Sequence, residues 1–261
     1  MNTKSNTMID LFYRELGEEN SQPLIILHGV FGSSDNWLTL GKRLAEGYRV
    51  FLLDQRNHGQ SSHDEEFTYQ AMADDLKHFI QDKGLEHAYI IGHSMGGKVS
   101  MLFALQNPEM LERLMVVDIA PRAYPVHHEA ILNGLQSIDL NSLKSRGQAD
   151  KALAEYVPIL GVRQFLLKNL YRKDKSTFAW RINLPVLARD IEKIGVEIEG
   201  KAFEKPTRFI RGLNSDYIQD QDQAHIQRLF PNSELVDFPK AGHWIHAEDP
   251  DGFYNTTVEF L

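Results

Sequence analysis

One stretch, residues 89–97, constrains the fold of this 261-residue chain more than any other. Three apolar β-forming residues lead into Gly-His-Ser-Met-Gly, and a helix-like segment, 98–104, follows directly. A Gly-x-Ser-x-Gly between a strand and a helix is typical of a nucleophile elbow. Gly92 and Gly96 leave room for the sharp turn, and the free N–H groups of the helix N-terminus favour negative charge beside Ser94. We predict that Ser94 is an acyl-transfer nucleophile; the alternative is a glycine-rich turn that contains a serine by chance.

Around this stretch the chain alternates between short apolar runs and helix-like runs. The expected strands are residues 9–15, 24–27, 48–53, 114–117, 206–211 and 234–238, and the expected helices are 35–46, 67–83, 222–229 and 249–261. Continuous apolar runs of this length are typical of parallel strands that are buried on both faces. The pattern predicts an α/β fold with a mostly parallel central sheet flanked by helices.

The strand pattern stops between residues 122 and 205. Helix-like runs take its place at 128–138, 149–156, 162–170 and 185–194. We expect residues 1–121 and 206–261 to form the core, and 122–205 to be a helical cap over the site. The cap carries 14 basic and 10 acidic residues, which leaves 14 against 26 in the core. Within 163–181 the balance is six to one, and a solvated face or an anionic substrate handle would explain it.

Two further residues complete a candidate constellation with Ser94. Asp118 directly follows the strand 114–117, and His243 lies in the loop after the last expected strand. In open α/β sheets the carboxyl ends of the strands form the ligand-binding edge. The carboxylate at this edge is either a helix cap or the group that orients a histidine. We favour the second role, with Asp216 as the alternative acid.

The same edge supplies main-chain donors and an apolar pocket. A His-Gly turn, His28-Gly29, follows the strand 24–27, and we expect Val30 and Met95 to donate their N–H groups to an oxyanion. Asp54 and Arg56 are expected to support these loops by hydrogen bonds, and His246 is expected at the surface. The expected substrate pocket is aromatic and consists of Phe31, Phe165, Tyr171, Trp180 and Trp244.

Composition excludes several other classes of protein. The chain has no cysteine, so disulfides and thiolate chemistry are excluded, and its net charge of −8 argues against nucleic-acid binding. His127 and His128 adjoin, but no third ligand is placed near them, so we predict no metal. We expect no cofactor, no membrane span, a cytoplasmic location because no signal peptide is visible, and a monomer or weak homodimer.

Four motifs give the chain a narrower resemblance. They are His-Gly-Val-Phe-Gly-Ser at 28–33, Asp-Gln-Arg-Asn-His-Gly at 54–59, Gly-His-Ser-Met-Gly-Gly-Lys at 92–98 and Val-Asp-Ile-Ala-Pro at 117–121. The third motif is widespread, whereas the second and fourth are selective. With the order Ser94, Asp118, His243, the chain resembles the α/β-hydrolase superfamily, and within it the YbfF-type esterases, whose eukaryotic relatives are the α/β-hydrolase domain 11 proteins.

The resemblance implies a role for each matching residue. Most α/β-hydrolases carry the acid as Gly-x-x-Asp after the penultimate strand, but Ser215 stands at that position here. In YbfF-type enzymes a serine also stands there, and the aspartate after the earlier strand is the acid. Ser94 would then be the nucleophile, His243 the base, Asp118 the orienting acid and Ser215 an additional hydrogen-bonding member. Asp216 remains the second choice.

These features predict a serine carboxylesterase that hydrolyses esters of small molecules through an acyl-enzyme. An acyl-CoA thioesterase would use the same triad, and a triad alone also leaves a C–C bond hydrolase or a lyase open. A haloalkane dehalogenase is excluded because it needs a carboxylate where Ser94 stands. The alternative from a different class is a non-catalytic small-molecule receptor on the same scaffold.

Overall fold

The computed structural model describes residues 8–125, 128–175 and 177–261. Its main feature is a seven-stranded sheet with the order β1-β3-β2-β4-β5-β8-β9. The strands are β1 (Tyr13–Leu16), β2 (Pro23–Leu27), β3 (Arg49–Leu53), β4 (Ala88–His93), β5 (Leu111–Val117), β8 (Thr207–Gly212) and β9 (Ser233–Phe238). Only β1 pairs antiparallel, with β3, and every other pair in this sheet is parallel. The predicted mostly parallel sheet is therefore confirmed.

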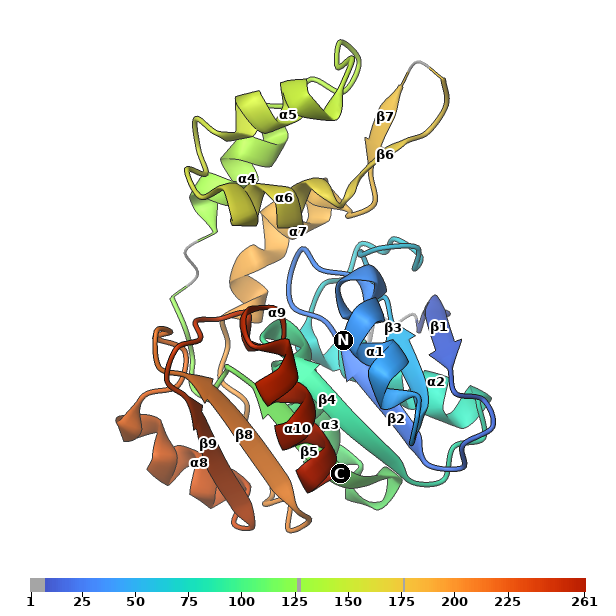
Figure 1. The fold of residues 1–261 in the computed structure, drawn as a ribbon, viewed down its shortest axis with the longest axis vertical. Coiled ribbons are helices and arrows are strands. Elements are labelled where there is room, and N and C mark those ends of the chain that lie inside the picture. The colour runs from blue at the N-terminus through green and yellow to red at the C-terminus, as the bar shows by residue number, and fades with distance from the viewer. Residues whose placement is uncertain (1–7, 126–127, 176) are drawn as a thin grey trace, which may run out of the picture.

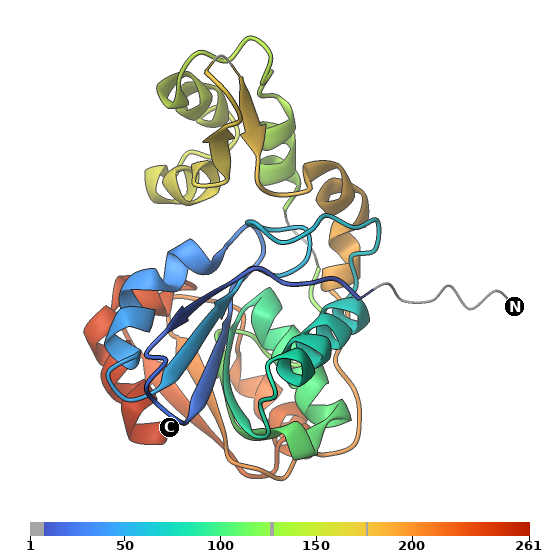
Figure 2. The same ribbon diagram turned by 90° about the vertical axis from the view of Figure 1, so that its right-hand side faces the viewer.

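Helices cover both faces of the sheet (Figures 1 and 2). One face packs on α1 (Leu38–Leu44) and α10 (Pro250–Phe260), and the other on α2 (Tyr69–Asp82), α3 (Met95–Gln106) and α8 (Gln223–Leu229). Successive strand residues point to opposite faces of the sheet. Leu24 and Ile26 therefore pack on the face covered by α1 and α10, while Ile25 and Leu27 pack on the face covered by α2, α3 and α8. Both faces of these strands are buried, which explains why the strands are apolar throughout.

A separate layer is inserted between β5 and β8, beyond the carboxyl ends of the strands (Figure 1). Its helices are α4 (Glu129–Gln136), α5 (Arg146–Leu153), α6 (Leu160–Leu167) and α7 (Leu184–Asp190), close to the four predicted positions. The layer also contains an antiparallel pair that the sequence pattern did not predict, β6 (Leu170–Arg172) and β7 (Phe178–Trp180). Strands of three residues are too short to show an alternating pattern in the sequence. Across this pair, the Arg172 guanidinium stacks on the Phe178 ring, at 4.5 Å from the ring centroid.

Candidate active site

Ser94 occupies the tip of the turn between β4 and α3. Its backbone has φ 53° and ψ −117°, a strained conformation that few non-glycine residues adopt. A Cβ at Gly92 would lie 2.4 Å from the Gly96 carbonyl oxygen, and one at Gly96 would lie 2.5 Å from the Leu27 carbonyl oxygen. The two glycines are therefore sterically required for the turn, as the sequence motif indicates. The N–H of Ser94 donates to the Val117 carbonyl at 3.0 Å, which ties the turn to the end of β5.

Asp118 and His243 meet beside this turn. Nδ1 of His243 lies 2.7 Å from Oδ2 of Asp118, and the aspartate side chain is fully buried. The other carboxylate oxygen, Oδ1, accepts the Gly212 N–H at 3.0 Å. A buried carboxylate acceptor favours the tautomer that carries its proton on Nδ1, which leaves Nε2 of His243 as a proton acceptor.

The loop after β8 bears on the choice between Asp118 and Asp216 as the acid that orients His243. The Ser215 N–H donates to the Gly212 carbonyl at 3.1 Å, and the Ser215 hydroxyl donates to Oδ2 of Asp118 at 2.5 Å. Asp216 follows it at an exposed position, and its main-chain carbonyl accepts a bond from Arg122 at 3.2 Å. Within the described part of the chain, no hydrogen bond or ion pair joins the Asp216 carboxylate to His243. The turn thus directs Ser215 to the buried acid and Asp216 to solvent.

Val30, Ser94 and Met95 line one small cavity. Met95 is the first residue of α3, so its N–H has no acceptor within the helix. In the described structure, neither the Met95 N–H nor the Val30 N–H has a hydrogen-bond acceptor. Two unpaired amides beside a serine hydroxyl are the donor arrangement that an oxyanion hole needs.

The loop that carries Val30 is held by residues from the 54–59 motif. Nε2 of His58 accepts the Phe31 N–H at 3.2 Å, and the Gln55 side chain donates to the His28 carbonyl at 2.5 Å. Arg56 makes a buried two-bond ion pair with Asp75, at 2.6 and 2.8 Å. This pair ties the 54–59 segment to helix α2. Burial lowers the pKa of His58 to about 3, so this ring stays neutral and keeps its acceptor nitrogen.

Three residues hold the loop of His243, and sequence reasoning missed all of them. Nε2 of His93 lies 2.8 Å from the His243 carbonyl oxygen. The Glu248 carboxylate accepts the N–H groups of the two residues that flank His243, at 2.7 and 3.1 Å. The Tyr217 ring stacks on the imidazole with 4.1 Å between centroids. His93 could have been suspected because it adjoins Ser94, but Tyr217 and Glu248 carry no local signal.

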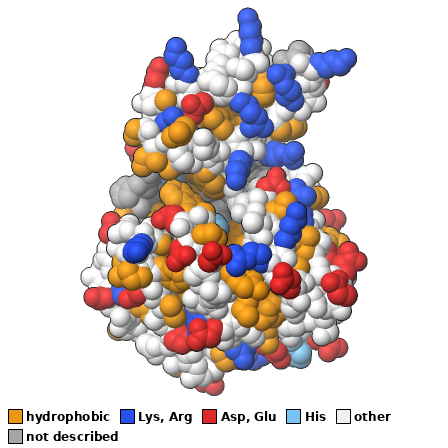
Figure 3. Space-filling model, viewed as in Figure 1, with side chains coloured by type: hydrophobic (Ala, Val, Ile, Leu, Met, Phe, Trp, Pro, Cys, Tyr) orange, Lys and Arg blue, Asp and Glu red, His pale blue; other side chains and the backbone are white. Residues whose placement is uncertain are grey.

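A cavity of about 230 Å³ lies between the sheet and the inserted layer, and Ser94 and His243 both line it. Figure 3 shows the surface hollowed at this level, with hydrophobic and histidine side chains in the hollow. Of the five residues expected in the pocket, Phe31, Phe165 and Trp244 line this cavity. Tyr171 and Trp180 do not, because they belong to the β6–β7 pair, where Arg181 stacks on Tyr171.

The surface position expected for His246 is wrong. Its side chain is only 9% exposed, lines the same cavity, and stacks on Trp37 with centroids 4.0 Å apart. His246 is buried because it lies in α9 (Ile245–Glu248), where its ring packs against Trp37 and Phe253. Burial lowers its pKa to about 3.

Two other features of the described residues bear on function. No three histidine, aspartate or glutamate side chains among them are grouped as metal ligands would be. Of the adjoining pair considered for a metal, His127 lies outside the described residues. No described helix is both long enough and apolar enough to cross a bilayer.

The chain is similar to known proteins over most of its length. Residues 22–250 match the alpha/beta hydrolase fold family. The sn-1-specific diacylglycerol lipase ABHD11 of Mus musculus is 38% identical, with 97% of this chain and 85% of that protein covered. Esterase YbfF of Escherichia coli strain K12 is 33% identical, with 94% of each chain covered. A solved structure described as a marine microorganism esterase is 41% identical, with a TM-score of 0.94 over 97% of this chain and 100% of that one.

The matched region contains every residue placed around the cavity, from His28 to Glu248. All strands of the large sheet except β1, the strained serine after β4 and the inserted layer before β8 lie within it. Sequence and architecture thus agree on one assignment. The chain belongs to the alpha/beta hydrolase fold family.

Proposed function

We propose that this protein is a serine carboxylesterase that hydrolyses carboxylic esters of small molecules through an acyl-enzyme on Ser94. The observation that carries the proposal is the 2.7 Å contact between Nδ1 of His243 and the buried carboxylate of Asp118, on the wall of a cavity that Ser94 also lines. The esterase and lipase names of the similar proteins support the same reaction.

The first half of the reaction forms the acyl-enzyme. Oγ of Ser94 attacks the ester carbonyl carbon while Nε2 of His243 takes the serine proton. The carbonyl oxygen becomes an oxyanion, and the unpaired N–H groups of Val30 and Met95 stabilise it. These donors are fixed before the charge develops, because the His58 bond holds the Val30 loop and the helix N-terminus holds Met95.

The acyl-enzyme is complete when the bond to the alcohol breaks and His243 gives its proton to the departing alcohol oxygen. In the second half, His243 takes a proton from the water that attacks the acyl-enzyme and returns it to Oγ of Ser94 as the carboxylic acid leaves. Asp118 stabilises the transient imidazolium, and the Ser215 hydroxyl and the Gly212 N–H fix that carboxylate in place. The whole cycle uses side chains and water, and requires no cofactor.

We also propose the division of the chain into a core, 1–121 and 206–261, and a cap, 122–205. The cap helix α6 contributes Val162, Phe165 and Leu166 to the cavity, which supports a role in selecting the substrate. The net charge of −8 supports a small-molecule substrate rather than nucleic acid. A cytoplasmic location and a monomer or weak homodimer stay predictions.

An acyl-CoA thioesterase would need the basic stretch 163–181 to bind phosphates. Two of its arginines are engaged within the cap: Arg163 pairs with Asp150 at 2.8 Å, and Arg172 stacks on Phe178 and donates to two carbonyls. An arginine held in this way is poorly placed to bind a phosphate group. This favours the ester over the CoA thioester as the substrate class.

The test is hydrolysis of p-nitrophenyl acetate, p-nitrophenyl butyrate and acetyl-CoA by wild type and Ser94→Ala. We expect turnover of the esters, a fall of at least about 10⁴-fold in Ser94→Ala, and labelling of wild type alone by a fluorophosphonate. Ester turnover that survives in Ser94→Ala would refute the nucleophile. Tight retention of an ester without turnover by wild type would identify a receptor, and faster turnover of acetyl-CoA would identify a thioesterase.

A further inference from the structure

Lys98 carries a charged group into the core of the protein. It lies on α3, one helical turn after Ser94, and its side chain is fully buried. Its ammonium nitrogen donates to three main-chain carbonyls: Pro121 at 2.8 Å, Arg122 at 2.6 Å and Val196 at 2.8 Å. All three N–H donors of the ammonium group therefore have an acceptor. Lysines are almost never buried to this extent without such a set of partners.

The three carbonyls belong to both connections between core and cap. Pro121 and Arg122 lie in the entering connection, residues 119–125, and Val196 lies in the returning connection, residues 195–206. The two connections also pair directly. The Tyr124 N–H donates to the Gly195 carbonyl at 2.7 Å, and the Ile198 N–H donates to the Pro121 carbonyl at 2.8 Å. One ammonium group thus fastens the two ends of the cap to the helix that carries the candidate nucleophile.

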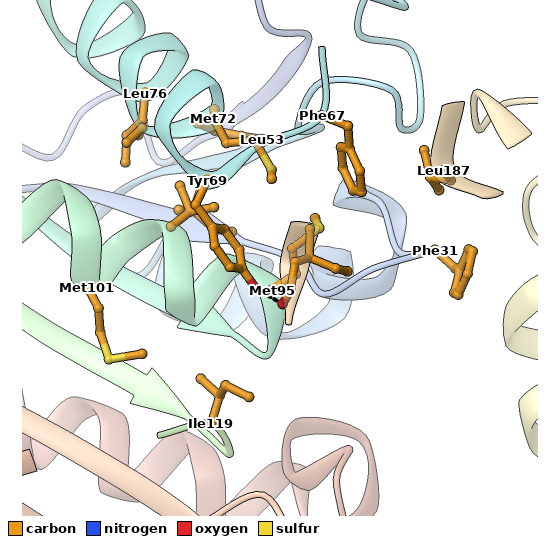
Figure 4. Close-up of a cluster of buried hydrophobic side chains, with 14 of the residues drawn as sticks. Phe31, Leu53, Phe67, Tyr69, Met72, Leu76, Met95, Met101, Ile119 and Leu187 are labelled. Carbon is orange, nitrogen blue, oxygen red and sulfur yellow. Dashed lines mark hydrogen bonds between the residues drawn. The ribbon is translucent and has the colours of Figure 1, made fainter. Parts of the chain in front are cut away.

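The paired connections extend to the candidate site by two routes. The Tyr124 hydroxyl accepts the Ala120 N–H at 2.8 Å and donates to the Tyr217 carbonyl, and the Tyr217 ring stacks on His243. Tyr124 and Gly195 also line a cavity of about 40 Å³ that Ser94 and Met95 share. Tyr69 lies next to Met95 in this region (Figure 4), and its hydroxyl donates to the carbonyl of Ile194, just before the returning connection.

We propose that Lys98 is a positioning residue that locks the two cap connections onto the nucleophile helix and thereby sets the wall of the cavity beside Ser94. It acts through its three carbonyl bonds and does not touch the substrate. An apolar residue at 98 would take this donor from the Arg122 and Val196 carbonyls and leave the Pro121 carbonyl with the Ile198 N–H alone, so the two connections would lose their attachment to α3.

Charged groups around Lys98 are few and of mixed sign. Burial is the main influence on Lys98 and lowers its pKa to about 7, Glu197 and Asp222 act to raise it, and Arg122 acts to lower it further. The ring of Tyr124, 5.1 Å from the ammonium nitrogen, and the three carbonyl oxygens favour the charged form.

Two variants and one control test the inference. Lys98→Met removes the three bonds with little change in volume, and Tyr124→Phe removes only the hydroxyl that reaches Tyr217. Lys201→Met is the matched control, because Lys201 is an exposed lysine of the same returning connection. The readouts are hydrogen exchange at the Tyr124 and Ile198 amides, and kcat and KM for p-nitrophenyl acetate and octanoate.

In Lys98→Met we expect exchange at both amides to rise at least about tenfold. The ratio of kcat/KM between acetate and octanoate should change at least about fivefold, mainly through KM, because the cavity wall moves while the reacting groups stay. Tyr124→Phe should shift the same ratio by about twofold, and Lys201→Met should match wild type.

Unchanged exchange in a folded Lys98→Met would overturn the inference, as would an unchanged acyl-chain ratio in both variants. If Lys98→Met does not fold, an unchanged ratio in Tyr124→Phe is sufficient to overturn it. The kinetic readout rests on the proposed esterase function. Failure of that function is distinguishable from failure of the inference, since wild type would then hydrolyse neither ester. The exchange experiment would still test whether Lys98 holds the two connections on α3.

Discussion

The core and the cap place side chains around one cavity in different ways. In the core, Ser94 directly follows β4, Asp118 directly follows β5, and His243 lies in the loop after β9. In the cap, the residues that line the cavity come from α6 and from the first part of α4, while the aromatic residues of β6 and β7 do not line it. The position of a residue along the chain, next to the end of a strand, therefore places the candidate catalytic groups of the core. The packing of its helices decides which residues of the cap line the cavity.

The register of the parallel strands explains the first case. His93 pairs with Val117, and Val117 pairs with Ile210, so β4, β5 and β8 reach the same edge together. The next residue in each strand enters the edge beside its neighbour, which brings Ser94 and Asp118 together. A helix has no such edge. Which of its sides meets the cavity depends on packing against the rest of the cap.

The largest effect expected in the core comes from its buried acid. Asp118→Asn should lower kcat/KM by about 10⁴-fold, because an amide favours the wrong tautomer of His243 and cannot stabilise the imidazolium. Asp216→Asn is the matched control at an exposed position and should stay within about threefold of wild type. Ester hydrolysis of the two variants at pH 7.5 decides between them. A large loss in Asp216→Asn with little loss in Asp118→Asn would show that the acid comes from the later loop.

Acid should destabilise the core through its buried histidines. Burial lowers the pKa values of His28, His58 and His246 to about 4, 3 and 3, whereas an unfolded chain titrates near 6.5. Because the unfolded state binds more protons below pH 6.5, the stability from each neutral ring is complete above 6.5 and falls as the pH drops toward the folded pKa. At pH 5 each ring lowers the free energy of unfolding by about 2 kcal/mol.

His246→Phe isolates one of these contributions while the ring still stacks on Trp37. Urea unfolding at pH 7.5 and pH 5.0 should show a loss of stability that is about 2 kcal/mol smaller in this variant than in wild type. His87→Gln, at an exposed position, is the control and should leave the pH dependence unchanged. An equal loss in wild type and His246→Phe would mean that the buried ring accepts a proton without cost.

The smallest effect on ester hydrolysis is expected from substitutions in the cap. It distinguishes an aromatic residue that lines the cavity from one that does not. Phe165→Ala should raise KM for p-nitrophenyl butyrate about threefold to tenfold with little change in kcat, because it removes apolar contact area from the cavity wall. Tyr171→Ala should leave KM within about twofold, since Tyr171 stacks with Arg181 instead. A similar rise in both variants would show that the substrate reaches the β6–β7 pair, and that the cap surface around the cavity is wider than its lining residues indicate.

Sequence patterns were reliable where local physics fixes the answer. The apolar runs became strands of a parallel sheet, and the Gly-x-Ser-x-Gly became a strained turn because no Cβ fits at Gly92 or Gly96. They were unreliable where distant packing decides. His246 reads as a polar residue near the end of the chain, yet α9 places it against Trp37. The β6–β7 pair was missed because its strands are three residues long.

The sequence by itself determined the fold class, the position of Ser94 at a turn, and the set of acids and bases available at the sheet edge. Only the tertiary structure decided that Ser215 turns to Asp118 while Asp216 faces solvent, that Tyr217 and Glu248 contact His243 and its loop, and that Lys98 bonds to both cap connections. The physical reason is range. Turn geometry and strand burial are written in neighbouring residues, whereas a hydrogen bond between residues about a hundred positions apart exists only once the chain has folded around both.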